Sequence, residues 1–196
     1  MSHKGLTSYQ LKTIKNNLRA FYNDATEDEK QSGRSWYSNA HQWCVKQSIN
    51  YGFTTEQVAG ALSALSPRNK WERNKFDTEA VMHALRNNEN IDEVKVCTFT
   101  SNKDKAVQIL RGERVIEESS PKTYSFVRNI AELDSNRVTV DVWHMRACFN
   151  KMREIPNLTD YRYKQIERAT LKVAEEFGEK GYEFQAIIWE QIRNSK

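Results

Sequence analysis

The fold is decided by residues 120–146, which read SPKTYSFVRNIAELDSNRVTVDVWHMR and contain two helix starts. Ser120-Pro121 begins the first helix, because proline suits the first helical position. Apolar residues then recur at helical spacing until the pattern breaks at Asp134-Ser135-Asn136. After a short extended segment, Asp141 can cap a second helix that runs to about Met152. This stretch therefore predicts two helices joined by a short break.

The same helical periodicity continues on both sides of this stretch, over most of the 196 residues. The predicted helices cover about 6–22, 34–51, 54–65, 75–87, 101–110, 121–133, 141–152, 159–177 and 182–193. Residues 24–30 are expected to form an acidic turn, and residues 91–98 form either a short strand or a loop. Only seven glycines and three prolines are available for turns, which argues against an all-β fold. We therefore predict an all-α protein with a single compact multi-helix domain over 1–196.

The composition allows a nucleic-acid partner and argues against several other classes. The formal net charge of +4 permits a polyanionic partner without requiring one. No apolar run approaches the roughly 20 residues of a membrane span, and no signal-peptide pattern is found. The cysteines and histidines lack the spacing of a disulfide framework, an iron–sulfur cluster or a zinc site. We expect no metal, no cofactor and no membrane contact, and a cytoplasmic location.

Lys122 and Asp141 are the candidate catalytic residues, because each stands at a helix start. The helix dipole and the free N–H groups keep a carboxylate ionised there, and it can stabilise a sugar cation as a base departs. The same dipole disfavours the charged form of Lys122, which leaves neutral amine for attack at a sugar carbon. Each residue also has a structural alternative, with Asp141 as a helix cap and Lys122 as a solvent-exposed cation.

Short motifs in this part of the chain resemble those of the helix-hairpin-helix DNA glycosylases of the endonuclease III class. The motifs are Leu62-Ser63-Ala64, Lys122-Thr123 and the segment 140–146, which reads VDVWHMR. They follow one another in the order and at the spacing of that family. The resemblance covers roughly residues 54–150.

This resemblance implies a DNA-glycosylase-like fold, with 54–152 as its core and 159–196 as closing helices. It implies that Lys122 matches the lysine of the members that are both glycosylase and AP lyase. It also implies that Asp141 is the catalytic aspartate and that Arg146 matches the arginine five residues after it.

Two departures from that family open an alternative. The family hairpin is rich in glycine, whereas residues 116–121 read IEESSP and carry two glutamates. Trp143 stands in place of the family histidine, and His144 follows one residue later. The pattern is also similar to the glycosylase-fold enzymes of bacteriophage DNA-base hypermodification, which would work in the host cytoplasm.

Residues 66–75, SPRNKWERNK, form the densest basic and aromatic stretch of the chain. Its cations are expected to bind phosphates while Trp71 stacks on a base; the alternative is a solvated turn with Trp71 packed on the core. His144 is either an acid/base or DNA contact or a core histidine. The candidate substrate-binding residues are Arg68, Asn69, Lys70, Trp71, Trp143, His144 and Arg146.

The preferred prediction is a DNA glycosylase-like enzyme, a hydrolase of the DNA-repair type acting on the N-glycosidic bond of a flipped base. Its partner would be DNA, either duplex or single-stranded. One alternative is a bacteriophage-type DNA modification enzyme on the same fold. The other is a non-catalytic, small helical nucleic-acid-binding or partner-binding protein in which Asp141 only caps a helix.

Overall fold

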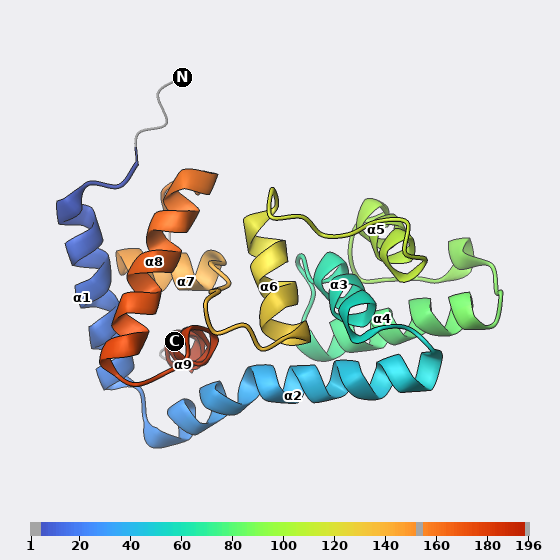
Figure 1. Cartoon of the computed structure of the whole chain (residues 1–196), viewed down its shortest axis with the longest axis horizontal. Coiled ribbons are helices and arrows are strands. Elements are labelled where there is room, and N and C mark those ends of the chain that lie inside the picture. Colours follow the sequence, from blue (N-terminus) through green and yellow to red (C-terminus); the bar gives the residue numbers. More distant parts are fainter. Residues whose placement is uncertain (1–4, 152–154, 195–196) are drawn as a thin grey trace. The chain divides into compact units, whose positions relative to one another are not determined.

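The computed structural model describes residues 5–151 and 155–194. Within these ranges the protein forms nine α-helices and one short 3-10 helix, with no β-strand (Figure 1). The prediction of an all-α fold is therefore confirmed. The elements are α1 Ser8–Asp24, α2 Glu27–Tyr51, α3 Thr55–Leu65, α4 Trp71–Arg86, η1 Ile91–Glu93, α5 Thr100–Leu110, α6 Pro121–Ala131, α7 Val142–Phe149, α8 Asp160–Glu176 and α9 Gly181–Asn194.

Contacts between residues divide the chain into two compact units. Unit 1 comprises residues 1–39 and 133–196, and unit 2 comprises residues 40–132. The first boundary falls within α2, so this helix contributes residues to both units.

Unit 1 is built around an apolar cluster shared by α1, α7, α8 and α9. Helix α1 packs against the other three, and α9 packs against α7 and α8 (Figure 1). Ile14, Leu18 and Ile166 are among the buried residues of this cluster. Gly33 allows α9 to lie close to α2, because a Cβ at Gly33 would stand only 2.5 Å from the backbone nitrogen of Ile187. A larger residue at position 33 would push α9 away from the core.

Unit 2 is built around α3. Every residue of this helix from Val58 to Leu65 is buried, and the helix packs against α4, α5 and α6. A helix that is covered on all sides belongs to the centre of a fold rather than to its surface. The elements that follow α3 in the chain therefore surround it, and their outer faces form the surface of unit 2.

The predicted acidic turn at residues 24–30 is wrong, because α2 already begins at Glu27. Thr26 Oγ1 accepts the backbone N–H of Glu29 at 3.2 Å, and Glu29 Oε2 accepts the backbone N–H of Thr26 at 2.9 Å. This reciprocal pair is a capping box. The acidic residues that suggested a turn stand at the N-terminus of a helix, where the dipole favours negative charge.

Residues 91–98 form η1 and a loop, and the strand alternative is therefore wrong. The loop is held from within by Lys103 of α5, which is 7% exposed. Its ammonium donates to the carbonyl oxygens of Ile91 at 3.0 Å, Val94 at 3.1 Å and Asp92 at 3.4 Å. These backbone carbonyls converge on one ammonium group, an arrangement that differs from the regular hydrogen bonds between neighbouring β-strands.

Two other predicted helices differ from the structure at their ends. Helix α4 begins at Trp71 rather than near Lys75, so part of the basic stretch is helical. Helix α7 ends at Phe149, because Asn150 adopts the left-handed conformation with φ of 48°. The predicted end at Met152 lies outside the described residues.

Candidate nucleic-acid interface

The basic loop, residues 66–75, connects α3 to α4 and includes the first turn of α4. The turn closes when Asn69 donates its backbone N–H to the carbonyl oxygen of Ser66 at 3.1 Å. Arg68 lies in the middle of this turn with φ of 60°. This is a left-handed backbone conformation, which residues other than glycine adopt at a cost in free energy. Lys70 is exposed and forms the N-cap residue of α4.

A buried carboxylate, that of Asp77 on α4, fixes this loop. Its side chain is 0% exposed and accepts three hydrogen bonds. The donors are Nδ2 of Asn69 at 2.9 Å, Nε of Arg73 at 2.7 Å and the backbone N–H of Cys97 at 2.7 Å. A buried carboxylate of this kind is stable only when its oxygens are paired. Asp77 therefore joins the basic loop, α4 and the segment before α5 into one rigid surface.

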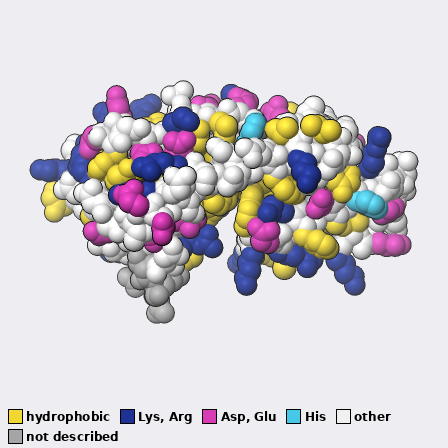
Figure 2. Space-filling model, turned by 90° about the horizontal axis from the view of Figure 1, so that it is seen from below, with side chains coloured by type: hydrophobic (Ala, Val, Ile, Leu, Met, Phe, Trp, Pro, Cys, Tyr) yellow, Lys and Arg dark blue, Asp and Glu magenta, His cyan; other side chains and the backbone are white. Residues whose placement is uncertain are grey.

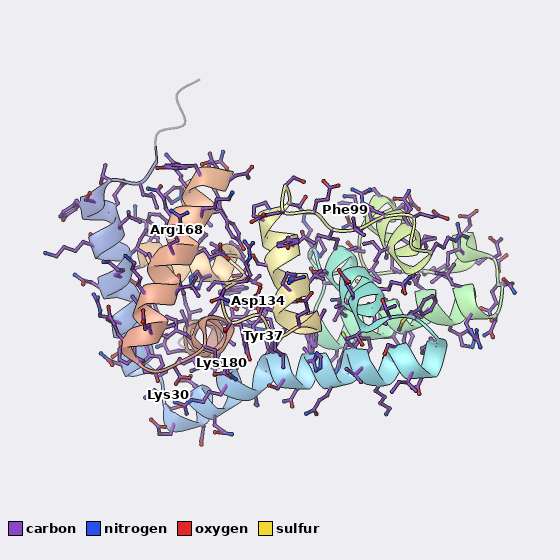
Figure 3. All side chains as sticks on the ribbon, in the orientation of Figure 1. Lys30, Tyr37, Phe99, Asp134, Arg168 and Lys180 are labelled. Carbon is purple, nitrogen blue, oxygen red and sulfur yellow. The ribbon has the colours of Figure 1, made fainter. Side chains whose placement is uncertain are left out.

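Cations and aromatic rings alternate on this surface. The guanidinium of Arg68 lies 5.4 Å from the ring centroid of Phe99, and that of Arg73 lies 5.1 Å from the ring of Phe76. Phe76 and Phe99 are 60% and 55% exposed, which is unusual for such large apolar side chains. Figure 3 labels Phe99. Figure 2 views the protein from below and shows Lys and Arg side chains beside apolar ones on that face.

The end of the loop nearest α4 is partly neutralised. Lys75 lies 5.7 Å from the ring of Trp71 and also forms an ion pair of 2.8 Å with the exposed Glu72. Trp71 is half-buried, so part of its indole is accessible to solvent and part packs against the protein. The cations that remain for a phosphate are therefore Arg68 and Lys70, at the tip of the loop.

The structure thus brings together the four predicted loop residues Arg68, Asn69, Lys70 and Trp71 on one surface. Their roles differ, since Asn69 donates a hydrogen bond to the buried Asp77, whereas Arg68 and Lys70 are exposed. Asp77, Phe76 and Phe99 also belong to this surface and were not predicted from the sequence. The spacing of Arg73 and Asp77, four residues apart on one helix, was a signal for their ion pair. No local pattern signalled that the two phenylalanines would be exposed.

Asp141 belongs to unit 1 and is the N-cap of α7, where Oδ1 accepts the backbone N–H of His144 at 2.8 Å. The extended segment before it is held by α8. Tyr163 Oη donates to the carbonyl oxygen of Val138 at 2.7 Å and accepts the backbone N–H of Val140 at 3.2 Å. The half-buried carboxylate is therefore held in position on both sides.

His144 is 1% exposed and belongs to the core of unit 1. Thr170 Oγ1 donates its proton to the carbonyl oxygen of Ile166 at 2.9 Å. The same oxygen therefore accepts a hydrogen bond from Nε2–H of His144 at 2.8 Å. Within the described residues the buried Nδ1 has no hydrogen-bond partner. Burial lowers the pKa of His144 from 6.5 to about 4. The ring is neutral at physiological pH, which favours the core alternative for this histidine.

The other two candidates on α7 contact each other. The guanidinium of Arg146 lies 4.3 Å from the ring centroid of Trp143, and both side chains are half-buried. Arg146 keeps a buried Nε that lacks a hydrogen-bond partner among the described residues. This stacked pair is a second aromatic and cationic feature, next to Asp141 in the chain.

Lys122 belongs to unit 2 and is exposed in the first turn of α6. The N-cap residue Ser120 provides no side-chain hydrogen bond to this turn. Lys122 and Asp141 thus lie in different units, and their joint action at a helix-start site stays a prediction.

Two further observations bear on cofactors and partners. In the described ranges, no group of three or more His, Cys, Asp or Glu residues is arranged to hold a metal ion. No helix there is long and apolar enough to cross a membrane.

The sequence was also compared with known proteins. The sequence model of a family of unknown function, DUF7178, matches residues 1–196. The chain belongs to this family. No curated protein and no solved structure matches it. The DUF7178 match spans both units.

Proposed function

We propose that this DUF7178 protein binds DNA through the basic loop of unit 2 and acts on a base in that DNA. The observation that carries the proposal is the buried Asp77, which fixes a loop with exposed cations and aromatic rings. Such a surface suits a nucleic acid, because cations neutralise phosphates and aromatic faces stack on bases.

The rigidity of the loop supports a binding role. A preorganised loop loses less conformational entropy on binding than a flexible one. Arg68 holds a left-handed backbone conformation that costs on the order of 1 kcal/mol, and such outliers concentrate at functional sites. The strained backbone holds the guanidinium outward, against the exposed ring of Phe99.

Asp141 is the proposed catalytic group. The N-terminus of α7 and the N–H of His144 favour its ionised form. An anion held in this way can stabilise the cation that forms on a sugar as a base leaves. In this proposal the reaction is hydrolysis of the N-glycosidic bond, in which water takes the place of the base at the sugar carbon and the base leaves with a proton. The alternative on the same fold is modification of a base that stays attached to its sugar. The resemblance to helix-hairpin-helix DNA glycosylases supports the same assignment.

The second candidate function is DNA binding without catalysis. The hydrogen bond between Asp141 and His144 favours it, because that bond is sufficient to explain an aspartate at this position. Base release from DNA distinguishes the two functions, whereas DNA affinity is expected for both.

The DNA contact is tested by fluorescence anisotropy with labelled duplex DNA over a range of salt concentrations. The variant Arg68→Gln/Lys70→Gln removes two phosphate contacts, and the slope of log K against log salt is expected to fall by about 1.8. The matched control Lys46→Gln/Arg111→Gln removes the same charge from exposed positions outside the loop. An unchanged slope in the loop variant, or an equal loss in the control, would refute the proposed contact.

A further inference from the structure

Unit 1 contains a groove between α1 and α8 with a volume of about 550 Å³. Four of its lining residues are cations and none is acidic. The cations are Lys15 of α1 and Lys164, Arg168 and Lys172 of α8. Figure 3 labels Arg168 on α8. We call this feature the α1/α8 groove, and no residue of the basic loop belongs to it.

The three cations of α8 are spaced four residues apart and form one stripe along the helix. At 1.5 Å per residue the stripe is about 12 Å long. Like charges at this spacing destabilise a helix by a few tenths of a kcal/mol per pair. Among the described residues none of the three has an ion-pair partner. The stripe therefore costs stability and is free to meet an external anion.

The walls of the groove are apolar and one end is aromatic. Leu11 and Leu171 line it, and Tyr161 is 57% exposed. The ring of Tyr161 is set by Gly5, because a Cβ at Gly5 would lie 2.3 Å from Tyr161 Cε1. The chain before α1 is held on α8 by Gln165, whose amide accepts from the N–H of Leu6 at 2.7 Å and donates to its carbonyl at 3.1 Å. The tyrosine thus has a fixed place in the groove.

The acidic residues near the ends do not cancel this charge. Glu176, beyond the stripe on α8, is paired with Arg19 of α1 at 2.7 Å. Asp160 and Glu175 are exposed on α8, four residues before Lys164 and three residues after Lys172. Neither lines the groove, and among the described residues neither forms an ion pair with the stripe. The charge of the groove itself therefore remains positive and is complementary to a polyanion.

We propose that the α1/α8 groove binds single-stranded nucleic acid. The phosphates of the strand lie along the stripe of α8, and a base stacks on Tyr161. Proteins that bind single strands combine a positive groove with aromatic rings in this way. A membrane surface fits less well as the partner. A protein that binds a membrane inserts protruding apolar side chains into it, whereas the apolar residues here line a hollow. The groove uses other residues than the basic loop, so the inference stands independently of that contact.

The first test measures binding of a short oligothymidylate to the full chain as a function of salt. Each phosphate contact to a single strand contributes about −0.7 to the slope of log K against log salt. The variant Lys164→Gln/Arg168→Gln/Lys172→Gln is therefore expected to lower the slope by about 2. The control Lys46→Gln/Lys95→Gln/Arg111→Gln changes three exposed cations outside the groove. Thermal unfolding checks the fold of each variant, and the stripe variant is expected to be at least as stable as the wild type.

The second test addresses stacking. Tyr161→Ala is expected to weaken oligothymidylate binding at least about fivefold, whereas Tyr161→Phe retains binding because the ring remains. Photocrosslinking with a thiothymine-containing oligonucleotide, followed by mass spectrometry, is expected to label residues of α8.

Each outcome is decisive and separates the groove from the basic loop. Loss of single-strand binding in the stripe variant but not in Arg68→Gln/Lys70→Gln supports the groove and leaves the loop to be judged on duplex DNA. An unchanged slope in the stripe variant overturns the inference. The inference is also overturned if the wild type binds anionic phospholipid vesicles but not oligothymidylate, and the stripe variant no longer binds the vesicles.

Discussion

The side chains of Asn69 and Asp77 are joined by a hydrogen bond of 2.9 Å between Nδ2 and Oδ2, and this bond attaches the basic loop to the interior of unit 2. The same carboxylate oxygen accepts the backbone N–H of Cys97. The position of the exposed cations therefore depends on a residue that no ligand touches.

Replacement of Asp77 by asparagine is expected to loosen the loop without changing the shape of the core. The variant loses charge-assisted hydrogen bonds, and we expect the free energy of unfolding to fall by about 2–3 kcal/mol. DNA affinity is expected to fall as well, although no phosphate contact is removed. Urea denaturation and anisotropy measure the two effects. Asp104→Asn, which alters an exposed aspartate of α5, is the control, and an equal loss in both variants would contradict the role of Asp77.

The burial of His144 is expected to make the folded protein less stable in acid. Its folded-state pKa of about 4 is below the unfolded value of 6.5, so folding favours the neutral ring. The contribution is complete above about pH 6.5 and disappears as the pH falls from there toward 4, a loss of about 3 kcal/mol. Denaturation at several pH values measures it.

Two observations separate His144 from other acid effects. The loss between pH 6.5 and 4 is expected to shrink in His144→Gln and to persist in His83→Gln, which changes an exposed histidine. The NMR signal of the His144 ring is expected to stay at its neutral position down to about pH 5.5. A titration of that signal above pH 6 would show that the ring is not sealed in the core.

Replacement of Lys103 is expected to destabilise the loop at residues 91–98. In Lys103→Met the carbonyl oxygens of Ile91 and Val94 lose their donor. We expect a cost of about 2–4 kcal/mol and faster proteolysis within residues 90–98. The control is Lys105→Met, an exposed lysine on the same helix. Retained protease resistance in Lys103→Met would mean that the loop is held by other contacts.

Asp141→Asn separates capping from catalysis. Asparagine caps a helix about as well as aspartate, so thermal stability is expected to change by less than about 1 kcal/mol. A catalytic carboxylate predicts that release of the base from modified or uracil-containing oligonucleotides is abolished while DNA binding remains. If the wild type releases a base and Asp141→Asn releases it at the same rate, the carboxylate is only a cap.

Lys122→Ala tests the lyase prediction. A lysine that attacks the sugar forms a Schiff base, which borohydride converts to a stable protein–DNA adduct. With oligonucleotides that contain an abasic site, the adduct is expected from the wild type and absent from Lys122→Ala. Lys151→Ala, at another exposed lysine, is the control. An adduct that persists in Lys122→Ala would assign the nucleophile elsewhere.

Most of the fold could be predicted from the sequence because its helices carry their own signals. The capping box at Thr54 and Gln57 and the proline at position 121 mark helix starts in the structure as they do in the sequence. The start of α2 was missed because Thr26 and Glu29 form the same box inside a charged segment without apolar periodicity.

The candidate interface was less predictable, because its organisation depends on contacts between distant residues. The basic stretch stands out by composition, but its attachment to Asp77 and Cys97 joins residues up to 28 positions apart in the loop, α4 and the segment before α5. The α1/α8 groove likewise needs two helices that are more than 130 residues apart in the chain. Periodicity describes one element at a time and does not indicate which faces meet.

The left-handed backbone of Arg68 makes it possible to separate loss of affinity from damage to the fold. Glycine adopts a φ of 60° without strain, so Arg68→Gly relieves the backbone while it removes the guanidinium. Such a protein would melt at a temperature no lower than the wild type and still bind DNA more weakly. This result would indicate that the arginine serves a contact outside the chain, because within the chain its guanidinium lies over the exposed ring of Phe99 and glycine would relieve the backbone.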